Sequence, residues 1–132
     1  MHRDLEALLR EKGIQPTSQR LAVAKYVLAT DEHPSADQVF AKVKPTLPIL
    51  SRATVYNTLN LFVKQGLLRE LIIAEGKTVF DPNVDRHHHF IEEDTGRIHD
   101  VPWNAVKVRN VEGLPDFEVH DYQVVMRGKK RS

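Results

Sequence analysis

Three consecutive histidines, His87-His88-His89, form the segment of this chain with the most evident capacity for chemistry. In an extended strand alternate side chains share a face, so His87 and His89 would point one way and His88 the other. If the following turn is a two-residue loop, Asp100 lies opposite His89 on the same face, whereas a bulge at Gly96 would shift that register. Two imidazoles and a carboxylate on one face suit a divalent transition metal. The spacing therefore predicts a metal site at His87, His89 and Asp100.

Two residues outside this segment extend the predicted metal site. Asp81 stands shortly before it, and His33 precedes a predicted helix in the N-terminal half. With the strand residues they would give three histidines and two carboxylates, a set that suits Fe²⁺, Mn²⁺ or Zn²⁺. The chain has no cysteine, which excludes disulfides and thiolate zinc sites. Whether His88 or His120 contributes to a second metal site stays open at this point.

A second segment, from Ser51 to Gly66, has the pattern of a helix that reads DNA. Ser51 is a favourable N-cap, and Gly66 favours the end of the helix. Apolar side chains gather on one side of the helical wheel, and short polar side chains on the other side would reach phosphates or base edges. The predicted DNA-contacting residues are Arg20, Ser51, Arg52, Thr54, Tyr56, Asn57, Asn60 and Lys64.

The elements around these residues predict a winged helix-turn-helix. Apolar periodicity and capping residues predict helices over residues 3–12, 17–28, 35–43 and 52–65. Two short β-type runs, 67–73 and 77–80, predict a hairpin. The fourth helix alone favours an ordinary amphipathic surface helix, but the hairpin that follows it reverses that preference, because helices followed closely by a hairpin are the layout of a winged helix-turn-helix. We therefore assign residues 1–82 to a winged-helix DNA-binding domain.

The remaining residues, 83–132, predict a small α/β domain for metal sensing and dimerisation, which makes the fold class α+β. The expected strands cover residues 87–92, 97–101 and 117–126, with an irregular or short helical link before the last one. A piece of about 50 residues buries too little surface to be stable alone. We therefore expect this part to rely on a second subunit, a bound metal or both.

Bulk composition limits the class of protein without identifying it. Hydrophobic residues make up 41% and charged residues 28% of the 132 residues, as in a soluble globular protein. The net charge of +1 does not reveal whether a local basic face exists. No apolar run is long enough to span a membrane, and the N-terminus lacks the apolar core of a signal peptide. We expect a cytoplasmic protein with no membrane partner.

Taken in order along the chain, these motifs resemble the ferric uptake regulator (Fur) family. The helix segment and the histidine segment form a specific combination in this order, while either alone is weak. The resemblance implies a winged-helix repressor that forms a homodimer through its C-terminal strands and binds a palindromic operator when metal is bound. The similar segments are residues 13–17 with Arg20, 33–37, 51–59, 80–81 and 87–90.

The resemblance also implies that His33, Asp81, His87, His89 and Asp100 are the regulatory ligands. Asp81, where other members carry Glu, is similar to the peroxide-sensing (PerR-like) branch. In that branch bound ferrous iron reacts with peroxide, and a ligand histidine, corresponding here to His33 or His87, is oxidised and the DNA is released. A cysteine-free chain with three histidines is also similar to the iron-response (Irr-like) branch, so haem or iron status is the alternative signal.

The chain departs from the family pattern in three places. Glu92 and Thr95 stand where many members carry the first pair of structural-zinc cysteines, so we expect no structural zinc held by cysteines. Gln15 stands where some members place a basic residue for the minor groove. The link from Pro102 to Pro115 is short for the dimerisation helix of the family.

Two other classes of function share part of this chemistry. A non-haem iron enzyme also holds its metal through histidines and carboxylates, with coordination positions open. Against an enzyme, the chain has no obvious substrate-pocket domain, and the helical half would have no role. A metal-binding interaction module without DNA contact is the third alternative. We predict a regulator that uses Fe²⁺ or Mn²⁺, with Zn²⁺ as an alternative ion, and no enzymatic activity.

Overall fold

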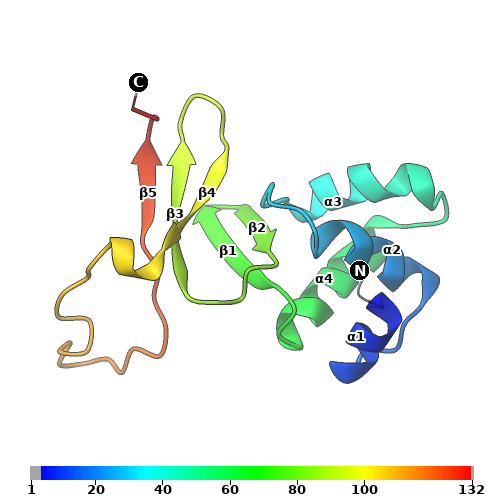
Figure 1. Cartoon of the computed structure of the whole chain (residues 1–132), viewed down its shortest axis with the longest axis horizontal. Coiled ribbons are helices and arrows are strands. Elements are labelled where there is room, and N and C mark those ends of the chain that lie inside the picture. The colour runs from blue at the N-terminus through cyan, green and yellow to red at the C-terminus, as the bar shows by residue number, and fades with distance from the viewer. Residues whose placement is uncertain (1–3, 132) are drawn as a thin grey trace. The chain divides into compact units, whose positions relative to one another are not determined.

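The computed structural model describes residues 4–131, which fall into two compact units (Figure 1). The first unit ends at Val84 and the second begins at Asp85. The boundary predicted after Pro82 lies two residues before this division. Each unit has its own sheet, a two-stranded one in the first unit and a three-stranded one in the second.

The helices of the first unit begin at residues whose side chains cap them. Thr17, Ser35 and Ser51 accept hydrogen bonds from the first-turn N–H groups, and Ser35 forms a reciprocal capping box. Arg3, the predicted start of the first helix, lies outside the described residues, and Asp4 caps that helix. Within residues 4–84 the helices are α1 (Leu5–Glu11), α2 (Ser18–Val27), α3 (Ala36–Val43), the 3₁₀ turn η1 (Lys44–Thr46) and α4 (Arg52–Lys64).

These helices pack around an apolar core. Val27 of α2, Val39 of α3 and the α4 residues Leu59 and Phe62 have no exposed surface. Burying each large apolar side chain contributes about 1.5–3 kcal/mol, so the first unit has its own driving force to fold. Among the described residues, no helix combines the length and the apolar character that crossing a bilayer requires.

A β-hairpin follows α4 and completes the winged helix-turn-helix. Strands β1 (Arg69–Ala74) and β2 (Lys77–Asp81) pair antiparallel, and Gly76 takes a φ of 71° in the turn. The first strand starts later than predicted because Leu67 and Leu68 are buried in the helical core. The second strand runs one residue further than predicted, to Asp81, which places that carboxylate on the sheet.

The second unit is a three-stranded sheet in the order β4-β3-β5. Strands β3 (His87–Glu92) and β4 (Ile98–Pro102) are antiparallel, the 3₁₀ turn η2 (Trp103–Ala105) follows, and β5 (Val125–Gly128) is parallel to β3. The prediction of a strand over 117–126 was wrong for residues 117–124, which form no regular strand. One cause is a contact between distant parts of the chain, because the Val124 N–H donates to the ring of His88 instead of to a strand backbone.

The interior of the second unit is mostly polar. Its buried residues within 85–131 are His87, His88, His89, Glu92 and the single apolar residue Ile98. The ring of His88 stacks on Trp103, with 4.5 Å between centroids and 16° between planes. The Arg86 guanidinium lies 3.9 Å from the centre of the Trp103 ring. Stacking and hydrogen bonds among these side chains therefore contribute to the stability of this unit.

Candidate metal centre and DNA-binding surface

The hairpin of β3 and β4 places one carboxylate beside two histidines. His89 pairs with Asp100 across the strands, which confirms the predicted register, and Gly96 forms the turn without shifting it. Asp100 Oδ1 lies 3.2 Å from His87 Nε2 and 3.4 Å from His89 Nε2. Both imidazoles are buried. Three atoms of the metal-ligand type therefore converge on one face of this sheet.

The other two predicted ligands lie together in the first unit. His33 Nε2 is 3.2 Å from Asp81 Oδ2, and both side chains are buried. The Phe80 N–H donates to Pro34 O at 2.9 Å, which ties β2 to the chain just after His33. Asp81 Oδ1 accepts from the Asn83 N–H at 2.9 Å, which holds the carboxylate in place. His33 has a φ of 51°, a conformation that costs a non-glycine residue about 1–2 kcal/mol.

In each of the candidate ligand histidines, His33, His87 and His89, the Nδ1 atom faces an oxygen that can only accept hydrogen bonds. Nδ1 must therefore be the donor, and in the neutral ring Nε2 keeps its lone pair. That Nε2 atom faces a carboxylate oxygen in every case. The Nδ1 acceptors are Asp31 O for His33 (3.0 Å), Asp85 O for His87 (2.6 Å) and Gln123 Oε1 for His89 (3.0 Å).

This arrangement fits the ligands of a metal ion. Neutral rings point lone pairs at carboxylate oxygens, which is repulsive unless a proton or a metal cation lies between them. Two ligand atoms that are each about 2.1 Å from one ion, at octahedral or tetrahedral angles, lie roughly 3.0–3.4 Å apart. The N···O separations of 3.2–3.4 Å fall in this range. Imidazole with carboxylate suits Fe²⁺, Mn²⁺ and Zn²⁺.

His88 differs from its two neighbours. Its Nδ1 accepts a hydrogen bond from the Val124 N–H at 2.9 Å, so Nε2 carries the proton in the neutral ring. That Nε2 is buried and has no hydrogen-bond partner among the described residues. The stack on Trp103 lies on the opposite side of the strand from His87 and His89, as the alternation of faces predicts. His120 is exposed, with Glu118 at 3.5 Å.

Helix α4 presents a polar face to solvent, as predicted. Tyr56, Asn57, Asn60 and Lys64 are exposed, and the Tyr56 side chain is large enough at 47% exposure to reach a partner. The Ser51 hydroxyl is engaged at the helix start, because it accepts from the Thr54 N–H and donates to the Thr54 hydroxyl. The exposed polar residues therefore extend along most of the helix.

The two predicted DNA-contacting arginines already have partners within the protein. Arg20 Nη1 donates to Gln15 O at 2.9 Å. Arg52 pairs with Asp37, and its guanidinium lies 4.7 Å from the centre of the Phe40 ring. Because both members of the Arg52–Asp37 pair are more than 60% exposed, the pair is worth only about 0.2–1 kcal/mol. Loss of Asp37 as a partner of Arg52 would therefore cost little.

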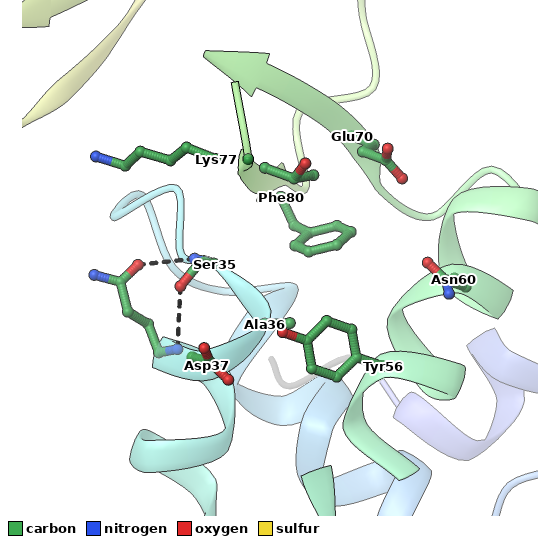
Figure 2. A pocket seen from close by; sticks show the side chains of 11 residues that line it. Ser35, Ala36, Asp37, Tyr56, Asn60, Glu70, Lys77 and Phe80 are labelled. Atoms are coloured by element: carbon green, nitrogen blue, oxygen red, sulfur yellow. Dashed lines mark hydrogen bonds between the residues drawn. The ribbon is translucent and has the colours of Figure 1, made fainter. Parts of the chain in front are cut away.

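A pocket of about 530 Å³ lies between α4, the start of α3 and the hairpin of the first unit. Figure 2 shows the rings of Tyr56 and Phe80 pointing into it. Asp37, Glu70 and Lys77 line it as well, so charges of both signs surround it. The exposed face of α4 thus continues into a hollow shared with the hairpin.

Sequence reasoning missed two side-chain contacts in the second unit. Gln123 binds the ring of His89 from 34 positions away, and no motif marks a glutamine for that role. Glu92 and His99 form a pair at 2.5 Å between their side chains. The predicted register implied this second pair, because diagonal neighbours on one face of a hairpin come within reach of each other.

Known proteins are similar to this chain over both of its units. Residues 11–127 match the Ferric uptake regulator family. The peroxide-responsive repressor PerR of Staphylococcus aureus is 34% identical over 125 residues, which cover 92% of this chain and 84% of PerR. The Campylobacter jejuni peroxide stress regulator has a TM-score of 0.68 and 27% identity, covering 97% of this chain and 94% of its own.

A structure of the ferric uptake regulator from Francisella tularensis with iron gives a TM-score of 0.73 and 26% identity, covering 90% of this chain and 93% of its own. Helices α2 to α4, the hairpin of the first unit, the histidine strand and the carboxylates at Asp81 and Asp100 all lie within the matched residues. By its sequence and its fold, this chain belongs to the ferric uptake regulator family.

Proposed function

We propose that this metal-responsive transcriptional repressor uses Fe²⁺ or Mn²⁺ as its regulatory ion and responds to peroxide. One observation carries the proposal: buried imidazoles aim their Nε2 atoms at carboxylates while their Nδ1 atoms are held by oxygens. Family membership makes the protein a regulator and not an enzyme. The likeness to a peroxide-responsive repressor supports peroxide over haem or iron status as the signal.

The proposed ligands of one ion are His33, Asp81, His87, His89 and Asp100. The geometry within each unit supports this set. His33 pairs with Asp81, and His87 and His89 both lie beside Asp100. An ion that takes ligands from both units would favour one arrangement of the DNA-binding unit over others. Because the ligand histidines must be neutral to bind, acid should weaken metal affinity.

The response to peroxide would depend on which ion is bound. Bound iron supplies reactivity toward peroxide, which manganese does not share. The chain itself contributes the burial and orientation of its ligand rings, since His33, His87 and His89 are each 5% exposed or less. These rings would therefore be the protein groups nearest to the oxidant. A ring that is oxidised would no longer hold its position.

The proposed DNA contacts lie on and beside α4. The exposed ring of Tyr56 can pack on a thymine methyl group, and its hydroxyl can donate to a phosphate. Arg52 would exchange Asp37 for a phosphate, and the start of α4 favours anions as any helix N-terminus does. The full proposed set is Arg20, Ser51, Arg52, Thr54, Tyr56, Asn57, Asn60 and Lys64.

The DNA-binding form is proposed to be a homodimer on a palindromic operator. Ile98 is the sole buried apolar residue within residues 85–131, while Leu114 and Phe117 are 47% and 72% exposed. A second copy would cover apolar surface of this kind. Two recognition helices would then meet half-sites separated by about one helical turn, roughly 34–36 Å, or a multiple of it.

DNA binding by the iron-loaded and the manganese-loaded protein, with and without peroxide, tests this function. Fluorescence anisotropy with the promoter DNA of the protein's own gene is the measurement. Both loaded forms should bind and the metal-free form should not, and peroxide should release only the iron form. Equal DNA affinity with and without metal would refute the proposed function. An iron-loaded protein that stays bound to DNA in the presence of peroxide would refute peroxide as the signal.

A further inference from the structure

His89 differs from the other two candidate ligand histidines in what holds its Nδ1 atom. The Nδ1 atoms of His33 and His87 bind backbone carbonyl oxygens of residues two positions earlier in the chain. The Nδ1 atom of His89 binds the side-chain amide oxygen of Gln123, 34 positions later, at 3.0 Å. A substitution can therefore remove the Nδ1 acceptor of His89, which is impossible for the other two rings.

Gln123 is itself held beside β3 by its neighbour in the chain. The Val124 carbonyl accepts from the His89 backbone N–H at 3.0 Å, and the Val124 N–H donates to His88 Nδ1 at 2.9 Å. Both backbone groups of Val124 are thus bound by consecutive histidines of one strand. His88, which accepts from the Val124 N–H, is itself fully buried and stacked on Trp103.

We infer that Gln123 is a positioning residue for metal binding, whose amide oxygen holds His89 with Nδ1 protonated and Nε2 directed at Asp100. The inference rests on the proposed function, because it assigns Gln123 a part in the same metal site. It gives the three histidines separate tasks. His87 and His89 supply ligand atoms, and His88 anchors the segment that carries Gln123.

The effect on affinity follows from the tautomer and the orientation of the ring. Without an acceptor at Nδ1, the His89 ring can turn or place its proton on Nε2, and either change removes the lone pair from the metal side. Loss of such a partner to a ligand histidine lowers metal affinity by about 10–100-fold. A carboxylate in place of the amide keeps the acceptor and makes the imidazole a stronger ligand.

The test compares Gln123→Leu, which removes the acceptor at similar size, with Gln123→Glu, which keeps it. Co²⁺ titration of each full-length metal-free protein, followed by visible absorption, gives both the affinity and the ligand field. Gln123→Leu should bind Co²⁺ about 10–100-fold more weakly with an altered spectrum, and Gln123→Glu should bind at least as tightly as the wild type. His120→Ala, an exposed change in the same segment, should leave both quantities unchanged.

A second measurement separates positioning from a general structural role. Nitrogen-15 NMR of the histidine rings in the metal-free protein reports which ring nitrogen carries the proton. The wild type and Gln123→Glu should show His89 protonated on Nδ1, while Gln123→Leu should not retain that state. If both Gln123 variants weaken Co²⁺ binding equally, Gln123 acts through folding alone and the inference is overturned.

The two levels of the proposal fail in different ways. If the wild type binds Co²⁺ and gains DNA affinity while Gln123→Leu behaves identically, the role of Gln123 is refuted and the proposed function stands. If the wild type binds no metal, both are refuted. The inference is supported only by a loss in Gln123→Leu that Gln123→Glu restores.

Discussion

The two units of this protein differ in the kind of side chain that they bury. The first buries a cluster of aliphatic and aromatic side chains, including Leu59 and Phe62, whereas the second buries three histidines, a glutamate and Ile98. Apolar burial is favourable without any partner, but buried imidazoles and carboxylates cost free energy unless each is bonded. The first unit therefore has an apolar driving force of its own to fold, whereas the second relies on buried polar side chains that are bonded to one another.

The largest expected effect tests the apolar core of the first unit. Leu59→Ala should lower the free energy of unfolding of the first unit by about 2–5 kcal/mol, because it removes a fully buried side chain of α4. Circular dichroism of the helices during urea unfolding measures this change. Trp103, the only tryptophan, lies in the second unit, and its fluorescence should shift less. Equal shifts in both signals would show that the units unfold as one.

The next effect addresses the second unit. His89→Ala should weaken metal binding by more than about 100-fold, since losing a ligand should exceed the 10–100-fold loss of an outer partner. Metal-dependent DNA affinity should disappear, while the urea concentration at which the helices of the first unit unfold should not change. Calorimetric titration with Mn²⁺ measures the affinity, and His120→Ala is the matched control. Retained metal-dependent DNA binding would refute the assignment of His89 as a ligand.

A smaller effect separates DNA reading from metal binding. Tyr56→Ala should weaken operator binding by about 1–3 kcal/mol, because it removes an exposed contact of α4 without touching the core. Anisotropy titration of operator DNA by the manganese-loaded variant gives this value. Metal affinity should be unchanged. A loss of metal binding would instead mean that this face of α4 is structural.

The smallest effect sharpens the idea that the second unit is held by polar pairs. His99→Phe removes the ring nitrogen that pairs with the buried Glu92 and should destabilise the second unit by roughly 1 kcal/mol. Trp103 fluorescence during urea unfolding is the readout. No change, with the helical transition also unmoved, would show that the pair contributes nothing to this unit.

Prediction from the sequence was most successful where a local pattern decides the structure. Capping residues such as Ser35 and Ser51 fixed the helix starts, and strand alternation placed His89 opposite Asp100. It failed over residues 117–124, where alternating apolar residues resembled a strand. There the Val124 N–H binds the His88 ring, a contact between distant parts of the chain that no local pattern encodes. Gln123 was missed for the same reason.

We propose that one ion takes ligands from both units. The most direct test of this claim is the metal content and Mn²⁺ affinity of His33→Ala in the first unit beside His89→Ala in the second. We predict that each variant loses the same single ion per chain and, with it, metal-dependent DNA binding. A His33→Ala protein that binds this ion with wild-type affinity would contradict the claim.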